Sequence, residues 1–425
     1  MVYESFRKIS ESAGAMDGWH PKELAYLSPG ICGHIATMLK QIEEGAPWPE
    51  STRHARVVFL EKVGAAIGEV MSYRPLTITS PLYRAWATMR LRSIEEWTVA
   101  WSLPEMFAGI PEMGAVDAWY KALTNIEELK LNGTPYCGGV ADIAKFFDQI
   151  RRKVVYKLAA QAGMPANILA AYIAFLESLT LYNCLAGGVG TPHHRQCGIP
   201  QGCPFSMMMT AIIMRPWIKL MRNIIQVECF ILADDVLIIA KGQQMITHFV
   251  QALNLTHTYL QAMGARIAPD KSYNFASTTV ATKWLNDTLW PEINDNIEVV
   301  EDFRYLGAHI TSGQTLRSKT LHSRWDKAVQ QLRRLKYTPA TIEAKAKAIL
   351  SKTYAVAFYG IEAAEIATDK VNHLAAVVID VFRSRNDMHN NDWFFSSFLG
   401  DKKDLDPKLQ IFTRRALQIR RAACK

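Results

Sequence analysis

The chain has 425 residues, of which 49% are hydrophobic and 21% charged, with 48 lysines and arginines against 40 aspartates and glutamates. This near-average composition excludes a disordered, collagen-like or disulfide-stapled protein. The length favours two to three domains or one multi-lobed enzyme, and the net charge of +8 points to a polyanionic partner without locating it.

Cysteine usage and the N-terminus bear on the cellular compartment. The seven cysteines form no Cys-x-x-Cys pair, so the sequence indicates neither a disulfide framework nor a zinc ribbon. The first residues lack the apolar core of a secretory signal, and no apolar run reaches the roughly 20 residues that span a bilayer. We expect a soluble, intracellular protein with no membrane partner.

The first third of the chain alternates helical and extended signals. Residues 17–46 and 80–101 place apolar side chains at helical spacing. Between them, residues 56–60 predict a strand. Pro75 disfavours a helix at Arg74, so a second ordered unit begins there.

A different pattern begins near residue 136. Residues 137–142 predict a short strand that ends on the carboxylate of Asp142. Asp148 is expected to cap a helix over residues 149–162, with Gly163 as its stop. The elements expected next are a helix over 165–180, a flexible connection over 187–190, a turn-rich loop over 196–202 and a helix over 205–222.

Two β-rich runs, residues 229–233 and 236–240, flank the pair Asp234-Asp235. This pattern predicts a hairpin with two acids at its tip. The elements expected after it are a helix over 246–263, a pair of strands around 303–310 and a largely helical chain from residue 317 onward.

Three acids in β-type apolar sequence, Asp142, Asp234 and Asp235, are the most informative feature. Burying unpaired carboxylates costs several kcal/mol unless a cation compensates. Mg²⁺ prefers carboxylate oxygens, and two such ions about 3.5–4 Å apart catalyse phosphoryl transfer. An Asp-Asp dipeptide alone is better explained by a solvated turn, so the inference depends on the whole set.

The order of several short motifs resembles that of reverse transcriptases, most closely the non-LTR (LINE-type) retrotransposon branch. The matching segments begin with Asp17-Gly18, Leu60-Glu-Lys62-Val-Gly64 and Tyr73-Arg74-Pro75-Leu76, and continue with Asp142-Ile-Ala-Lys-Phe-Phe147-Asp148, Gly198-Ile-Pro-Gln201-Gly202, Ala233-Asp234-Asp235, Gly264 to Lys271-Ser272 and Phe303 to Gly307. The resemblance runs from about residue 16 to about residue 360.

The resemblance implies an α+β right-hand polymerase fold, with fingers, a palm built on a small antiparallel sheet, and a helical thumb. The expected divisions are residues 1–135 for an N-terminal extension and fingers, 136–312 for the palm, 313–365 for the thumb and 366–425 for a C-terminal helical extension.

The resemblance also assigns roles. Asp142 and Asp234 would bind two Mg²⁺ ions, with Asp235 alongside and Mn²⁺ as an alternative metal. The residues expected to bind the nucleotide are Lys62, Arg74, Phe147, Gln201, Gly202 and Lys271. An aromatic ring at Phe147 would crowd a 2′-hydroxyl and favour deoxynucleotides. Taken alone, Lys62 fits a surface charge, Phe147 a core residue and Lys271 a solvated turn.

The function so implied is RNA-directed DNA polymerisation on an RNA template and DNA primer, with dNTPs as substrates. Two alternatives stay open: a non-catalytic nucleic-acid-binding relic of a mobile element, and a maturase-like splicing cofactor. Leu232 replaces the usual tyrosine, and Ala108-Gly109-Ile110 lacks the arginine of the usual Gly-Phe-Arg stretch. We expect an isolated or truncated polymerase module, nuclear if it is the product of an active retroelement.

The excess positive charge is concentrated in residues 317–352, which contain ten lysines and arginines and two acids. Within this segment an apolar stripe from Leu321 to Leu335 is expected to pack against the palm. The basic face would hold the template–primer duplex through Arg324, Lys327, Arg333, Arg334 and Lys336. A solvated helix face is the alternative. A basic tail, with Arg414, Arg415, Arg420, Arg421 and Lys425, would extend the track.

Overall fold

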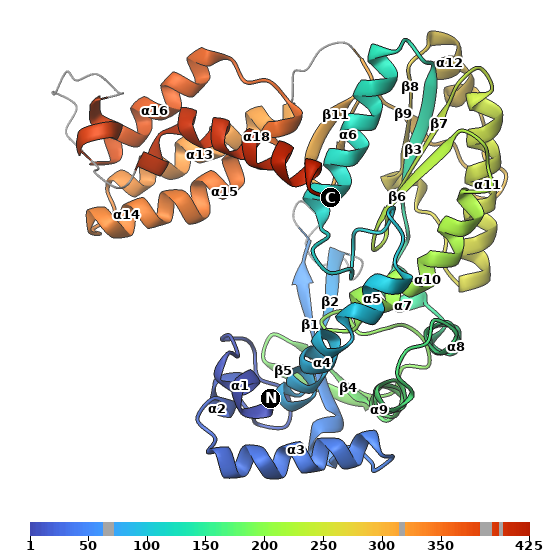
Figure 1. Cartoon of the computed structure of the whole chain (residues 1–425), viewed down its shortest axis with the longest axis vertical. Coiled ribbons are helices and arrows are strands. Elements are labelled where there is room, and N and C mark those ends of the chain that lie inside the picture. Colours follow the sequence, from blue (N-terminus) through green and yellow to red (C-terminus); the bar gives the residue numbers. More distant parts are fainter. Residues whose placement is uncertain (63–71, 314–318, 383–392, 399–402) are drawn as a thin grey trace.

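The computed structural model describes residues 1–62, 72–313, 319–382, 393–398 and 403–425 (Figure 1). Val63, Gly64 and Arg317, which belong to the motifs and basic segment above, lie outside the described residues. Helices and small, mostly antiparallel sheets alternate along the chain, which confirms the α+β class. No helix of the described part is long and apolar enough to cross a membrane.

The helices before the last sheet are α1 (Val2–Arg7), α2 (Pro21–Leu24), α3 (Pro29–Glu43), α4 (Pro81–Ser93), α5 (Glu95–Trp101), α6 (Ala115–Leu131), α7 (Phe146–Gln149), α8 (Arg152–Gln161), α9 (Ala166–Glu177), α10 (Ser206–Met221), α11 (Met245–Met263) and α12 (Thr279–Asp287). Those after it are α13 (Lys319–Lys336), α14 (Ile342–Ala348), α15 (Tyr354–Ala357), α16 (Thr368–Phe382) and α18 (Pro407–Ala423). The strands are β1 (His54–Glu61), β2 (Tyr73–Ile78), β3 (Tyr136–Asp142), β4 (Thr180–Leu185), β5 (Gly188–His193), β6 (Val227–Leu232), β7 (Asp235–Lys241), β8 (Tyr273–Ala276), β9 (Glu298–Val299), β10 (Asp302–Tyr305) and β11 (Ala308–Thr311).

A five-stranded sheet in the order β6-β7-β3-β8-β9 lies between α6 and α11 in the lobe at the upper right of Figure 1. Alternate side chains of a strand point to opposite faces. In β7, Val236 and Ile238 join a core that includes α10 and α11, whereas Leu237 and Ile239 join a core that includes α6. The sheet is therefore covered on both faces, and its chemistry is confined to the strand ends.

A second sheet has the order β2-β1-β4-β5, with β1 parallel to β4 and the other pairs antiparallel. Its supporting helices meet in an aromatic cluster, where the ring of Tyr83 stacks on that of Phe175 and Trp48 packs edge-on against both. This sheet draws strands from both sides of the division expected at residue 135. The expected flexible connection over 187–190 is wrong, because strand β5 begins at Gly188.

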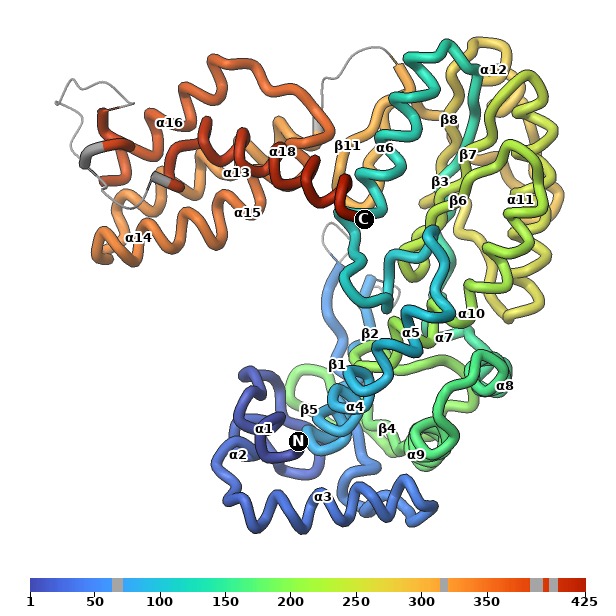
Figure 2. The backbone as a smooth tube through the Cα atoms, in the orientation of Figure 1, coloured from blue at the N-terminus to red at the C-terminus, as the bar shows by residue number. Residues whose placement is uncertain are grey.

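The C-terminal helices form a separate apolar core. Leu321, Trp325 and Leu332 of α13 are buried as the stripe predicts, but they pack in this core with residues of α15 and α16 and not against the palm sheet. The same core contains Val378 and Leu405, so one apolar interior spans the division expected at residue 365. Figure 2 shows the last helix, α18, running back until the C-terminus lies beside α6.

The expected long helix after Asp148 is also wrong. The chain forms α7, breaks at Ile150-Arg151 and resumes as α8, and Asp148 lies inside α7 without capping either helix. Gly163 does follow the end of α8, with a positive φ of 80° that suits glycine.

Candidate active site

The three aspartates meet where β3 and the β6–β7 hairpin end. Asp142, the last residue of β3, lies directly opposite Asp235, the first residue of β7. Asp234 directly precedes Asp235 in the tight turn formed by Ala233 and Asp234, and its charge interacts with that of Asp142. Facing residues of an antiparallel pair have their Cβ atoms about 4.5–5.5 Å apart. The register therefore brings together acids that are far apart in the sequence.

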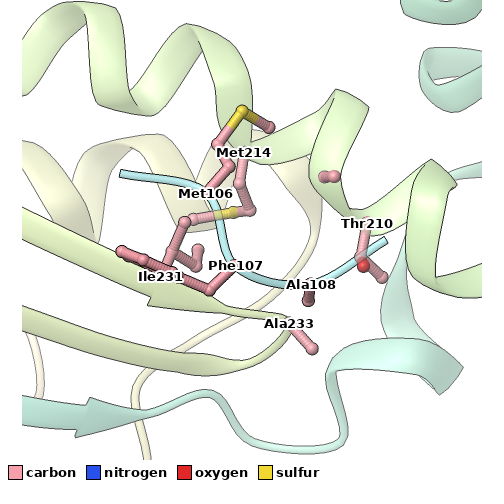
Figure 3. Close-up of a pocket in the computed structure, with 8 residues that line it drawn as sticks. Met106, Phe107, Ala108, Thr210, Met214, Ile231 and Ala233 are labelled. Carbon is pink, nitrogen blue, oxygen red and sulfur yellow. The ribbon is translucent and has the colours of Figure 1, made fainter. Parts of the chain in front are cut away.

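The hairpin tip is held in an unfavourable backbone conformation. Ala233 has a φ of 58°, a region that costs a non-glycine residue about 1–2 kcal/mol. Behind it lies a cavity of about 10 Å³, lined by apolar groups of the 106–108 loop, α10 and β6 (Figure 3). Such a space holds no more than a water molecule. Packing thus supports the tip from behind, and the substrate has to approach from the side of the acids.

Electrostatics set these carboxyl groups apart from ordinary surface acids. Burial raises the pKa of Asp235 to about 7, with further contributions from the charges of Asp234 and Asp142. Burial also raises the pKa of Asp234 and of Asp142. Lys271 opposes the shift at Asp142, from an ammonium 3.6 Å away. Like charges are therefore gathered with little compensation from the protein.

This donor set suits a hard divalent cation. Within the described residues, no group of three or more His, Cys, Asp or Glu side chains is arranged to hold a metal ion on its own. Mg²⁺ is usually bound by one or two carboxylates together with water and substrate phosphate oxygens. The residues present fit that ion because each supplies carboxylate oxygens, and burial together with the neighbouring acids raises the pKa of each carboxyl group.

Two cations of the other sheet act on the same acids. Arg74 is exposed on β2, and its charge counteracts the effect of burial on the pKa of Asp234. Lys62 is exposed just beyond β1 and acts likewise on Asp142. The Lys62 N–H donates to the Ser72 carbonyl at 2.9 Å, which keeps the two strands paired up to this point.

Lys271 comes from a third segment, the turn Pro269–Lys271. The Asp142 N–H donates to Ser272 Oγ at 3.2 Å, and the Ala268 N–H donates to the Asp142 carbonyl at 2.8 Å. These bonds hold the turn against the end of β3. Ser272 is buried and positions both Asp142 and its ion-pair partner. Ser272 belongs to one of the sequence motifs, but the sequence did not predict this positioning role.

Gln201 and Gly202 lie against β2. The Thr77 N–H donates to the Gln201 carbonyl at 2.8 Å. Gly202 has a φ of 114°, and a Cβ there would lie 2.6 Å from the Thr77 carbonyl oxygen. Gly202 thus makes a close approach to the backbone of the strand that carries Arg74.

Phe147 is tied to the same loop. The Ile199 N–H donates to its carbonyl at 2.8 Å, and its ring packs edge-on against that of Phe146. Phe146 is buried, whereas Phe147 is only partly so. Arg195 bonds the Asp148 carboxylate at 3.0 Å. Phe147 is therefore not simply a core residue, and Asp148 anchors the loop.

Arg152, which has no local sequence signature, completes this support. Its side chain is 4% exposed, and its Nε donates to the Gly198 carbonyl at 2.7 Å. A second bond runs to the Leu176 carbonyl at 3.1 Å. A buried arginine that bonds two backbone carbonyls fixes the loop relative to α9.

The two departures from the family pattern are both built into the packing. Leu232 ends β6 opposite Asp235 and packs at the edge of the core that includes α6. Gly109 has a φ of 69°, and a Cβ there would lie 2.5 Å from the backbone of Met207. Gly109 is thus required by the approach of its loop to α10.

The basic residues of α13 divide into two kinds. Lys327, Arg333 and Arg334 are exposed. Arg324 instead donates to the Tyr359 carbonyl at 2.7 Å and lies over the Tyr359 ring, and Lys336 forms an ion pair with Asp380 at 3.1 Å. The charged groups of Arg324 and Lys336 therefore bind other parts of the protein.

The basic tail also differs from expectation. Arg421 and Lys425 bond Asp117 of α6, and Arg415 donates to backbone carbonyls at Ile361 and Ala364. These three side chains bind the protein itself.

The geometry is that of a polymerase palm, with acids at the adjoining ends of a central strand and a hairpin. A family model for reverse transcriptase (RNA-dependent DNA polymerase) matches residues 61–310, which is more than half of the chain and contains all three acids. The chain belongs to the reverse transcriptase family. No curated protein matches it.

Proposed function

We propose that this chain is an active RNA-directed DNA polymerase that extends a primer 3′-hydroxyl with dNTPs. The observation that carries the proposal is the register of β3 and β7, which sets Asp142 opposite Asp235 beside Asp234. Asp142 and Asp234 would hold two Mg²⁺ ions, or Mn²⁺ in their place, with Asp235 alongside. When bound, these ions supply an activated attacking oxygen and neutralise charge on the phosphoryl group.

The chain's own cations bind the rest of the nucleotide. Arg74 offers a planar guanidinium fork and Lys62 a point charge, both suited to phosphate oxygens. Lys271, 3.6 Å from Asp142, lies where it can neutralise the leaving pyrophosphate or give it a proton. Gln201 and Gly202 hold β2 in place beneath the nucleotide.

Phe147 selects the sugar. A partly buried ring, fixed through its own carbonyl and through the Asp148–Arg195 pair, leaves little room for a 2′-hydroxyl and offers it no hydrogen bond. Deoxynucleotides are the favoured substrates for that reason.

Three parts of the chain would together bind a template–primer duplex. We assign the sheet of β1, β2, β4 and β5 to the fingers, the five-stranded sheet to the palm and the helices from α13 onward to the thumb and C-terminal extension. Lys327, Arg333 and Arg334 are exposed and available to phosphates of the RNA template and DNA primer. The order of motifs favours a non-LTR retrotransposon origin and therefore a nuclear site of action.

The test is primer extension by the purified chain on an RNA template, with dNTPs and rNTPs supplied separately. The expected result is metal-dependent incorporation of dNTPs, with little incorporation of rNTPs, and its loss in Asp234→Ala. Extension by that variant at the wild-type rate would sink the proposal. Nucleic-acid binding without incorporation by the wild-type chain would favour the non-catalytic relic or the maturase-like cofactor.

A further inference from the structure

A cleft between the N-terminal segment and α4 lies outside the polymerase site. Its volume is about 270 Å³, close to that of the smallest ligand sites of proteins. Residues of α1, of the segment that follows it and of α4 line it, and Pro204, just beyond the Gln201-Gly202 turn, closes one side. Figure 1 shows α1 beside α4 at the end of the molecule away from the thumb.

The helical repeat of α4 builds one wall of this cleft. Pro81, Ala85, Thr88 and Arg92 follow one another at intervals of three or four residues and so share one face of the helix, with Arg84 beside them. The opposite wall includes Lys8. Three cations thus line a single cleft, and none of the lining residues is an aspartate or glutamate.

Hydroxyl groups complete the lining, at Ser5, Ser10, Ser12 and Thr88, of which Thr88 already donates to the Arg84 carbonyl at 2.8 Å. The Arg84 guanidinium donates to Ser12 Oγ at 3.3 Å and to the Ala13 carbonyl at 2.7 Å. Because Ser12 Oγ accepts that bond, its own proton is free to be donated elsewhere. The wall is therefore rich in donors that suit oxygen acceptors.

The surroundings of Arg84 disfavour its positive charge. Burial lowers the pKa of its guanidinium, the charge of Asp17 opposes that shift, and the nearby charge of Arg56 adds to it. Within the described part of the chain, its Nε–H is buried and has no hydrogen-bond acceptor. The protein itself thus leaves the hydrogen-bonding capacity of this guanidinium incompletely used.

We propose that this cleft binds a phosphate group, carried by an RNA chain or by a free nucleotide. Arginine and lysine charges with hydroxyl donors are the groups that recognise phosphate oxygens in proteins. Carboxylates, which would repel such a ligand, are absent from the lining. The site is separate from the catalytic acids and does not require the proposed polymerase activity.

The experiment measures binding, not catalysis, so that it can succeed or fail independently of the proposed function. The variant is Lys8→Glu with Arg92→Glu, because both side chains line the cleft and are exposed. The matched control is Lys153→Glu with Lys157→Glu on α8, which makes the same change in charge on exposed residues outside the cleft. Probes are a single-stranded RNA oligonucleotide, adenosine monophosphate and, as a ligand without phosphate, adenosine.

The cleft variant is expected to bind RNA about tenfold more weakly than the wild type at moderate salt, with a shallower salt dependence, because fewer phosphates are neutralised. The control variant should stay within about twofold of the wild type. Weaker binding of RNA alone assigns the site to the polymer, and parallel weakening of adenosine monophosphate, but not of adenosine, assigns it to free nucleotides as well.

Two results would overturn the proposal: wild-type affinity of the cleft variant for both phosphate-bearing probes, or an equal loss in the control. The neutral pair Lys8→Gln with Arg92→Gln is measured beside them. It should show a smaller loss in the same direction, which separates an effect at the cleft from misfolding by introduced acids.

Discussion

Asp117 and the three aspartates of the palm have opposite electrostatic surroundings. Asp117 of α6 is 9% exposed and accepts two hydrogen bonds of 2.7 Å from Arg421, with Lys425 at 3.0 Å. Burial raises the pKa of Asp117, but the bonds from these two cations outweigh burial and leave it lowered. At the hairpin tip, burial and neighbouring acids raise the pKa of Asp235 to about 7.

We infer from this difference that Asp117 is a structural carboxylate and that the acids of the palm serve the proposed active site. Asp117 has its counter-ions within the chain and fastens the C-terminus of α18 to α6, across 304 residues of sequence. At the acids of the palm, Lys271 lies 3.6 Å from Asp142, and Lys62 and Arg74 act from the other sheet, yet the pKa values of Asp142 and Asp234 stay raised. Uncompensated buried acids of this kind mark sites of cation binding or catalysis.

The largest expected effect is on catalysis at the tip. Asp234→Asn should lower the rate of primer extension by at least about 10³-fold, because it removes a proposed metal ligand and its charge. The unfolding free energy should stay the same or rise, since a repelling charge is removed from among like charges. Chemical denaturation and primer extension measure the two. A clear loss of stability would mean that Asp234 is a structural acid like Asp117.

At Asp117 the expected effect is a loss of stability. Asp117→Asn should lower the unfolding free energy by about 2 kcal/mol, since it weakens charged hydrogen bonds at a buried group. The exposed Asp287→Asn is the control and should change stability little.

The contribution of Asp117 should also depend on pH, with a definite sign. A lowered pKa in the folded state stabilises the protein at pH values above the ordinary aspartate pKa of 3.8, and this stabilisation is lost as the pH falls through the lower folded value. Denaturation curves of the wild type and of Asp117→Asn should therefore converge on acidification. A stability difference that does not shrink as the pH falls below 3.8 would contradict the assignment.

A smaller effect is expected at Lys271, which forms an ion pair with Asp142. Lys271→Met should slow primer extension about tenfold, whereas Lys271→Arg should keep most of the activity. Single-turnover kinetics at saturating dNTP separates this loss of rate from weaker nucleotide binding. Wild-type rates in the methionine variant would make Lys271 a solvated turn residue.

The smallest effect concerns the backbone of the tip. Ala233→Gly should raise the unfolding free energy by about 1 kcal/mol, because glycine adopts a positive φ without strain. Ala186→Gly is a matched control: this alanine has a φ of 49° in the β4–β5 turn, away from the acids. Equal stabilisation, with activity altered only in Ala233→Gly, would show that strain at the tip serves the site.

Local pattern was sufficient for the elements that carry the acids. The β-rich runs around Asp234-Asp235 predicted the hairpin of β6 and β7, and the run before Asp142 predicted β3. Helix α11 begins and ends within one residue of its predicted bounds, with Gly264 at a φ of 89° just after it. Such features depend on alternation, helical spacing and stop residues, which neighbouring residues determine.

Prediction failed where distant segments compete for the same residue. Aspartate is a common helix-capping residue, but the carboxylate of Asp148 forms an ion pair with Arg195 instead. For Arg324 and Lys336 the structure adds partners within the protein, Tyr359 and Asp380, that the spacing of a basic face does not indicate. No local pattern identifies such a partner.

By itself the sequence determined which residues are acidic, which runs are strands and in what order the motifs occur, and hence the family to which the chain belongs. Only the tertiary structure decided that Asp142 faces Asp235, that the apolar stripe of α13 packs within the C-terminal core, and that Arg421 fastens to Asp117. The physical reason is that strand register and ion pairs between distant segments follow from how whole elements pack. Local sequence sets each element's type and exposed groups, but not its neighbours.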